Sequence, residues 1–209
     1  MTMKSNIISF LSFLLVLLFD SSCFSQEKEF KSSWEIGISS GQSFIDYFDG
    51  FETSGLSYSR GLTIKPELTY DFSRYFSSSI SLLITTAHEG DKNSNYLRVQ
   101  KTSIYGASVF NLYQTTLAPE IQFSPIKTTR HKLYIGIGPT YTIGNSLLSQ
   151  SDNELSTTMA KSISEFGYQG TLGYKFSICK KWTIGGNYIY NKNAEKTEHL
   201  LISLGYKIN

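Results

Sequence analysis

The sequence predicts an all-β protein, an eight-stranded antiparallel up-and-down transmembrane β-barrel. Three observations support this fold class: alternating apolar and polar residues in eight segments, alternating short and long connections, and an amino-terminal segment that resembles an export signal. The composition agrees, because charged residues make up 17% of the chain. The surface alone of a soluble domain usually carries about 25–35% charged residues.

The first 25 residues have the layout of a cleavable secretory signal peptide. Lys4 is the only charge before a nearly unbroken apolar run at 7–19, and small residues precede the expected cleavage site after Ser25. The run is shorter than the about 20 residues of a membrane helix. We therefore divide the chain into a signal peptide, 1–25, and a barrel domain, 26–209. A lipoprotein acylated at Cys23 is the alternative, although such signals usually carry leucine where this chain has Asp20.

Alternation with a period of two predicts the strands, because successive side chains of a strand point to opposite faces. It is clearest from Leu62 to Phe72, where every second residue is apolar. The same alternation occurs in the preceding segment around Trp34. In the segment that follows Phe72, serine alternates with apolar residues. A tilted membrane strand needs about 9–11 residues. The predicted strands are 33–44, 61–72, 76–87, 109–123, 132–143, 166–176, 182–190 and 199–208.

The later strands repeat this pattern with small residues in the polar frame. Pro119-Glu120 in the fourth strand stands where the second has Pro66-Glu67. Glycine and threonine alternate with bulky apolar residues in the fifth and sixth strands. Trp182 opens the seventh, and leucine, isoleucine and tyrosine occupy every second position of the eighth. Small polar-frame residues favour a narrow lumen.

The connections alternate in length. The short ones are 73–75, 124–131 and 177–181, and the long, polar ones are 45–60, 88–108 and 144–165, followed by a modest last loop at 191–198. Short periplasmic turns and long extracellular loops are typical of bacterial outer-membrane barrels. An even number of strands places both termini on the periplasmic side.

Charge placement indicates which frame meets lipid. The charged residues of the strands all belong to the polar frame: Glu35, Lys65, Glu67, Asp71, Glu120, Lys132, Lys175 and Lys207. A lipid-facing Lys or Arg costs about 2–4 kcal/mol at mid-bilayer, so we expect the polar frame to line the lumen. Pro66, Pro119 and Pro139 lie inside strands, where local bulges are expected to accommodate them.

Several segments resemble the small outer-membrane β-barrel families of Bacteroidetes-type bacteria, the OmpX-like and PorT-like group. The resemblance covers the whole chain and rests on Phe24-Ser25-Gln26, Pro66-Glu67-Leu68, Gly136-Ile137-Gly138-Pro139 and the alternating end Leu200, Ile202, Leu204, Tyr206 and Ile208. It implies insertion by the barrel-assembly machinery and, through the PorT-like members, a part in assembling an outer-membrane secretion system. The chain ends Ile208-Asn209 and so lacks the terminal aromatic residue usual in these proteins.

Eight strands enclose an interior that side chains just fill, which argues against a general porin. Because unpaired buried charge is strongly unfavourable, we predict an ion network that closes the lower lumen, formed by Lys65, Glu67, Glu120, Lys175 and Lys207. The candidate contact surface is the acidic, aromatic loop that contains Asp46, Tyr47, Phe48, Asp49 and Phe51. Aromatic residues on loops favour recognition.

Catalytic, cofactor and metal sites are not predicted. His88, His131 and His199 have no second histidine or cysteine at metal-ligand spacing, and none begins the His-x-Ser pattern of barrel-borne lipid A deacylases. The net charge of +2 gives no nucleic-acid signature. We predict a non-enzymatic outer-membrane protein with a structural or loop-mediated binding or adhesion role. Its expected partners are outer-membrane lipid and an extracellular or secretion-system protein. The alternative is a lipid-modifying barrel enzyme that acts on lipid A or phospholipid acyl chains.

Overall fold

A computed structural model describes residues 31–46, 58–91, 97–99, 102–104, 107–151, 156–193 and 196–208. Residues 32–209 belong to one compact unit. The predicted signal peptide lies outside the described residues, and so do Tyr47, Phe48, Asp49 and Phe51 of the predicted contact loop. Within the described ranges, no helix is both long enough and apolar enough to cross a membrane.

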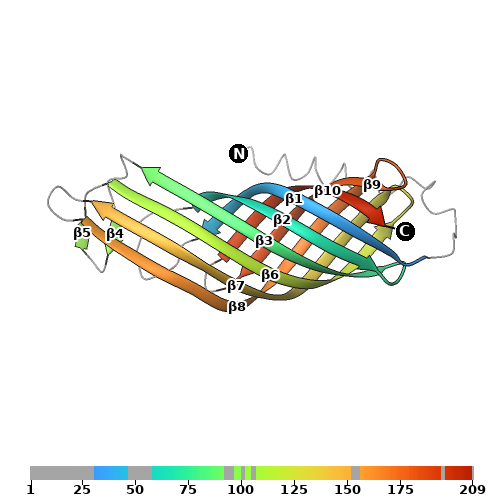
Figure 1. Ribbon diagram of the computed structural model, residues 1–209, viewed down its shortest axis with the longest axis horizontal. Helices are drawn as coiled ribbons and strands as arrows, with labels where there is room; N and C mark the ends of the chain where they lie inside the picture. Colours follow the sequence, from blue (N-terminus) through green and yellow to red (C-terminus); the bar gives the residue numbers. More distant parts are fainter. Residues whose placement is uncertain are drawn as a thin grey trace, which may run out of the picture. The chain divides into compact units, whose positions relative to one another are not determined.

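Eight antiparallel strands close into one barrel (Figure 1). Each strand pairs with its neighbours in the chain, and the first and last strands pair to close the barrel, which confirms the predicted fold class. A separate two-stranded sheet consists of β4 (Leu97–Val99) and β5 (Thr102–Ile104). The barrel strands are β1 (Ser33–Asp46), β2 (Tyr58–Asp71), β3 (Phe76–Asp91), β6 (Ala107–Lys127), β7 (His131–Ser151), β8 (Ser156–Ser177), β9 (Trp182–Lys192) and β10 (Lys196–Ile208).

The stagger of the strands sets the tilt and width of the barrel. One circuit along paired residues starts at Trp34 of β1 and returns to β1 at Phe44, ten positions further on (44 − 34). With about 3.3 Å per residue and about 4.8 Å between strands, this stagger over eight strands gives a tilt of about 40°. The circuit runs through Trp34, Tyr70, Ser78, Ile121, Ile137, Gly170, Tyr190, Glu198 and Phe44.

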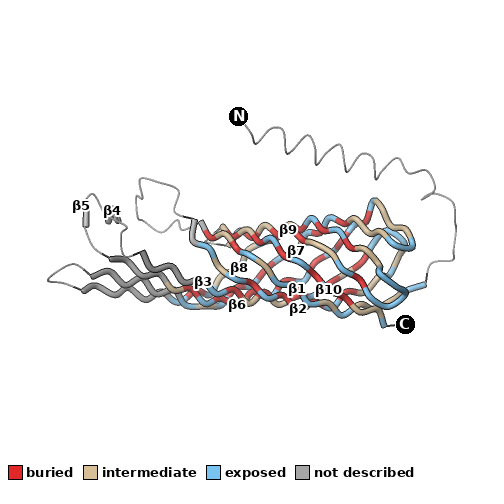
Figure 2. The backbone as a smooth tube through the Cα atoms, turned by 90° about the horizontal axis from the view of Figure 1, so that it is seen from above, coloured by how far each residue is buried: buried red, intermediate tan, exposed pale blue. Residues whose placement is uncertain are grey.

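Buried and more exposed residues alternate along the barrel strands wherever burial is described (Figure 2), because successive side chains face the lumen and the outside in turn. Outward apolar residues are well exposed, for example Ile137 at 69% and Ile202 at 71%. The charged residues of the predicted polar frame point inward, and Lys65, Glu67, Glu120 and Lys175 are buried. The prediction that the polar frame lines the lumen is therefore confirmed.

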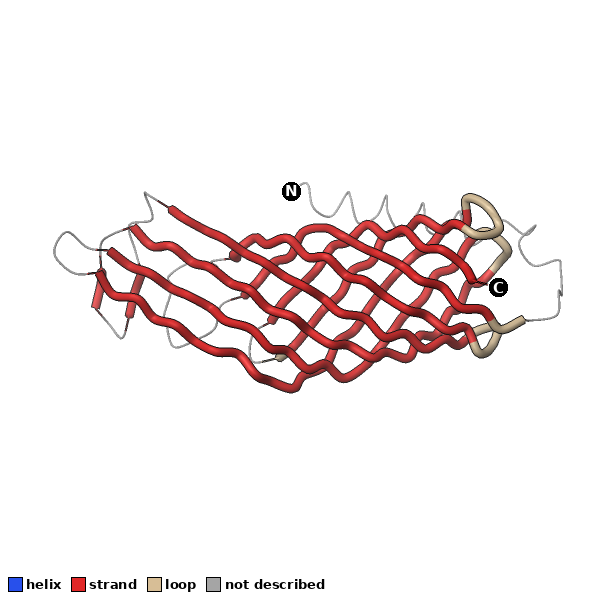
Figure 3. Tube along the Cα trace, in the orientation of Figure 1, coloured by secondary structure: helices blue, strands red, loops and turns tan. Residues whose placement is uncertain are grey.

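One side of the barrel is taller than the other. The neighbours β3, β6, β7 and β8 have 16, 21, 21 and 22 residues, whereas β9, β10, β1 and β2 have 11, 13, 14 and 14. We call the end with the short turns at 72–75, 128–130 and 178–181 the turn end, and the opposite end the loop end. The longer strands continue past the others at the loop end as a projecting wall (Figure 3).

The projecting wall corrects two predicted loops. Residues 88–108 and 144–165 were expected to be long loops, but β3 continues to Asp91, and β7 and β8 pair as far as Ser151 and Ser156. Strand pairing is made by backbone groups. It can therefore continue where the alternation of apolar side chains has stopped.

The three prolines that were predicted inside strands occupy gaps in the pairing rather than bulges. Pro119 and Pro139 stand at opposed positions of β6 and β7, inside a three-residue interruption that leaves the register unchanged. Pro66 lies in a similar gap between β2 and β3. Because two opposed prolines share one gap, their missing N–H groups interrupt the barrel at a single place. The expected bulges at these three prolines were wrong. The register shift of β6 and β7 lies between Phe123 and Ile126, a segment that contains the fourth strand proline, Pro125.

Candidate functional site

The lumen is filled by four layers of side chains between the turn end and the loop end. Strand β3 contributes to all of them in order, through Ser77, Leu83, Thr85 and Ala87. The first is an ionic layer. The second is an apolar layer of Leu83, Ala118, Ile189 and Leu201. The third is a hydroxyl layer around His199, and the fourth is an apolar layer of Ile45, Ala87, Leu112 and Ile163.

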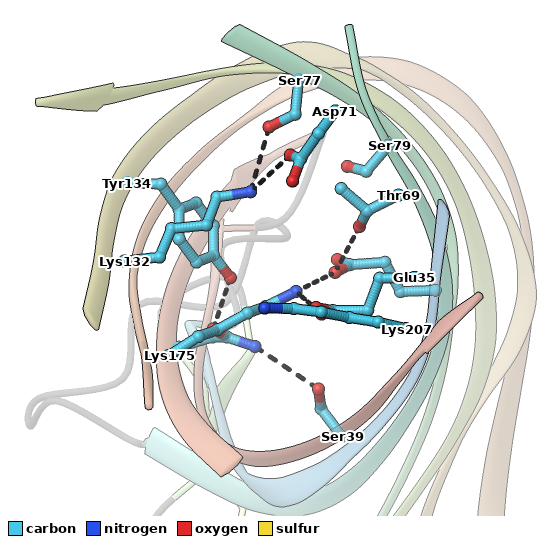
Figure 4. Close-up of polar contacts among 12 residues, drawn as sticks. Glu35, Ser39, Thr69, Asp71, Ser77, Ser79, Lys132, Tyr134, Lys175 and Lys207 are labelled. Atoms are coloured by element: carbon cyan, nitrogen blue, oxygen red, sulfur yellow. Dashed lines mark hydrogen bonds and ion pairs between the residues drawn. The ribbon is translucent and has the colours of Figure 1, made fainter. Parts of the chain in front are cut away.

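The ionic layer is built around Glu67 of β2. Its carboxylate forms ion pairs with Lys65, two residues away on the same strand face, and with Lys175 of β8, whose Nζ lies 3.3 Å from Oε1. Lys175 also pairs with Glu35 of β1, with 2.6 Å between Nζ and Oε1 (Figure 4). These four residues, with side chains 1–12% exposed, form one connected network across three strands.

A second group of charges lies at the rim of the turn end. The Asp71 carboxylate accepts from Lys127 and Lys132, at 2.9 Å in each case, and Lys132 also donates to Ser77 at 3.3 Å. Asp71 is the last residue of β2, while Lys127 and Lys132 flank the β6–β7 turn. These ion pairs connect β2 with β6 and β7, which are not its neighbours in the barrel.

Two members of the predicted ion network lie outside these ion pairs. Glu120 accepts hydrogen bonds from neutral groups, at 2.8 Å from Gln122 Nε2, at 2.9 Å from Gln169 Nε2, and from the Thr171 hydroxyl. Lys207 donates to Ser177 Oγ at 3.1 Å. The structure therefore brings together Lys65, Glu67 and Lys175, and places Glu120 and Lys207 beside polar, uncharged partners among the residues it describes.

Tyr134 is a central lumen residue that the sequence analysis did not select. Its side chain is fully buried, its hydroxyl donates to Asn187 Oδ1 at 2.6 Å, and the Nζ atoms of Lys132 and Lys175 lie 5.7 and 5.6 Å from its ring centroid. Gly173 leaves room for the ring, since a Cβ there would overlap it. A tyrosine in a polar frame that otherwise holds small and charged residues is the signal that could have indicated it.

His199 is the centre of the hydroxyl layer. Its Nδ1 lies 2.9 Å from Ser43 Oγ and 3.1 Å from Thr63 Oγ1, and Thr63 in turn contacts Thr85 Oγ1 at 2.7 Å. On the other side of the ring, Asn191 Nδ2 lies 3.4 Å from Nε2. The sequence analysis placed His199 at the start of the last strand, with no second metal ligand at a suitable spacing. It missed these contacts because they join five strands, β1, β2, β3, β9 and β10.

The Ser43–His199 contact has the separation of a nucleophile and its base, but its surroundings are those of a packing interaction. The ring is held from both sides, by the Ser43 and Thr63 hydroxyls at Nδ1 and by the Asn191 side chain at Nε2. Both residues are at most 1% exposed, between the two apolar layers.

The other predicted site residues are more dispersed. Asp46 is the last residue of β1, opposite Lys196 and Tyr58 in the register. His131 Nδ1 lies 2.7 Å from the hydroxyl of Tyr174 near the turn end. No cluster of three potential metal-ligating His, Cys, Asp or Glu side chains occurs in the described part of the chain.

Comparisons with known proteins find the same fold among solved structures. Neither a family model nor a curated protein matches the chain. Among solved structures, Ail of Yersinia pestis, crystallised with the heparin analogue sucrose octasulfate, is 18% identical with a TM-score of 0.51 over 86% of this chain and all of that one.

Two further solved structures have the same fold. Neisserial surface protein A is 12% identical, with a TM-score of 0.52 over 86% of this chain and 99% of that one. The outer membrane protein OprG from Pseudomonas aeruginosa is 14% identical, with a TM-score of 0.54 over 85% and 97%. This chain is thus similar in fold to small outer-membrane and surface β-barrels.

Proposed function

We propose that this protein is an integral outer-membrane β-barrel that is closed to solutes and acts by binding a partner at its loop end. The observation that carries the proposal is the combination of a filled lumen with a projecting wall. The four layers leave the interior to side chains, as expected for eight strands. A filled lumen leaves no room for a ligand, so we place the binding site on the strands that project beyond the others at the loop end.

The outer surface supports a place in a membrane. Every second residue is outward and is apolar or aromatic from Leu62 of β2 to Phe72, the residue that follows the end of β2. These ten positions at about 3.3 Å each, tilted by about 40°, give a band about 25 Å high, the height of the apolar band in outer-membrane barrels. Similarity of fold to outer-membrane and surface proteins supports the same location.

The projecting wall has a strand edge that suits a partner. β9 pairs with β8 only from Tyr168 to Ser177, so within the described strands the segment 156–167 of β8 pairs on one side, with β7. An open edge offers backbone N–H and C=O groups to an extended segment of another protein. An extracellular protein or, as the resemblance to PorT-like barrels implies, a secretion-system component would bind there.

The membrane part of the proposal is tested with the refolded mature chain. A folded barrel should migrate differently from the boiled protein on a gel, and planar bilayers that contain it should show no steady conductance. Steady conductance of the wild type would contradict a closed lumen. If that conductance were also unchanged in Glu67→Gln and abolished by a change in the wall, the ionic layer would not be what closes the lumen.

The binding part is tested by shortening the wall. Residues 147–160 are replaced by Asn-Gly, a two-residue turn that joins Ser146 to its register partner Lys161. Crosslinking in intact cells should recover a defined partner with the full-length protein and lose it with the shortened one. A partner retained equally by both would exclude the removed segment 147–160, including the part of the open edge at 156–160, as the binding site.

The lipid-modifying enzyme remains the alternative, and the Ser43–His199 contact is the observation that would favour it. It predicts that lipid A or phospholipid acyl profiles change when the protein is expressed and revert with Ser43→Ala. The binding proposal predicts profiles that are identical with the protein, without it and with the variant, as measured by mass spectrometry.

A further inference from the structure

Basic residues are concentrated on the three turns of the turn end. Arg74 lies in the β2–β3 turn, Arg130 in the β6–β7 turn, and Lys180 and Lys181 in the β8–β9 turn. All four side chains are exposed, and none forms a salt bridge with another described residue. We call these four residues the basic collar.

Acidic residues at the same end point the other way. Glu35 faces the lumen and pairs with Lys175, and Asp71 pairs with Lys127 and Lys132. The three turns themselves contain no Asp or Glu. Among the described residues, the negative charge at the turn end is therefore inside the barrel and paired, while the positive charge of the collar remains outside.

The collar runs around the barrel rather than over one face. In the order of the barrel strands, its turns join β9 to β8, β7 to β6 and β3 to β2, so they are separated from one another around the circumference. A soluble protein that docks on one side would meet one or two of these turns. A planar layer that surrounds the barrel would meet all three.

Aromatic residues fix the level of the collar. Outward rings next to the turns pack in pairs, Trp34 with Tyr70 at 4.5 Å and Trp182 with Tyr206 at 5.1 Å between ring centroids. The Lys181 Nζ lies 5.8 Å from the ring centroid of Tyr206. Trp and Tyr mark the interface between the apolar band and the headgroups, so the collar stands at headgroup level.

We propose that the basic collar binds the phosphate groups of anionic phospholipids in the leaflet that faces the turns. This proposal rests on the membrane location proposed above. Each Lys or Arg near an anionic surface strengthens binding about fivefold, and Arg pairs with phosphate through two parallel hydrogen bonds. The ligand class is thus a phosphodiester headgroup with net negative charge, such as phosphatidylglycerol, in preference to the zwitterionic phosphatidylcholine.

The test uses the refolded mature chain in detergent, titrated with either lipid and followed by native mass spectrometry. The collar variant replaces Arg74, Arg130, Lys180 and Lys181 by Gln. The control variant makes the same change at Arg60 and Lys192, two exposed basic residues near the loop end. The gel shift of unboiled protein verifies that each variant folds, so failure of the barrel and failure of the collar are separate results.

We expect the wild type to bind phosphatidylglycerol at least tenfold more tightly than phosphatidylcholine. The collar variant should lose this preference and the control should keep it. Equal affinity for both lipids in the wild type, or a preference that survives in the collar variant, would overturn the proposal. Displacement of the lipid by an equal concentration of glycerol 3-phosphate would overturn it as well, because the collar would then recognise free phosphate rather than a lipid surface.

Discussion

Replacing Glu67 by Gln should strongly destabilise the barrel. Glu67 is 6% exposed and is the carboxylate through which Lys65 and Lys175 are connected. The amide keeps the shape of the side chain but removes its charge. Lys65, at 1% exposure, then has no carboxylate within ion-pair distance among the described residues, whereas Lys175 keeps Glu35 at 2.6 Å.

The magnitude follows from these contacts. At an effective dielectric constant of about 20, the 3.3 Å pair between Glu67 and Lys175 is worth about 5 kcal/mol before desolvation is subtracted. Removal of one partner from a buried pair costs about 3–5 kcal/mol, because the other charge stays buried and unpaired. We therefore expect the free energy of unfolding to fall by about 3–5 kcal/mol.

The assay is urea unfolding of the barrel in phospholipid vesicles, followed by tryptophan fluorescence and by the gel shift of unboiled protein. The double variant Glu67→Gln/Lys65→Met is the matched comparison. It removes the stranded ammonium group and should recover more than half of the loss. A single variant within about 1 kcal/mol of wild type, or a double variant no more stable than the single one, would refute the assigned role of Glu67.

Three further outcomes are expected. Ile137→Lys places a cation on the lipid-facing surface of β7 and should cost about 2–4 kcal/mol in the same vesicles; a loss below 1 kcal/mol would mean that this face does not meet lipid. Gly173→Val should reduce the yield of folded protein, because its Cβ overlaps the ring of Tyr134, and adding Tyr134→Leu should restore the yield. The pKa of the exposed Cys179 thiol is lowered by backbone N–H groups of Lys181 and Trp182. More thiolate is then present at neutral pH, so alkylation should reach its half-maximal rate at a lower pH than that of a free cysteine thiol measured in the same buffer, and an equal or higher midpoint would contradict this.

The sequence predicted the barrel through local rules. All eight strands are present, and the three short turns lie where they were expected within a few residues. Residues such as Pro119 and Pro139 show the limit of this reasoning. That they oppose each other across one gap depends on the register between β6 and β7, which neither segment specifies alone.

By itself, the sequence determined which residues face inward. Successive side chains of a strand must point to opposite faces, and charge on a lipid-facing surface is strongly unfavourable, so Glu67 and Glu120 both had to lie in the lumen. Only the tertiary structure decided what each of them meets there. A stagger of ten residues around the closed barrel sets the height of every inward side chain. It brings Lys175 to Glu67 but places Gln169 and Thr171, rather than a lysine, beside Glu120.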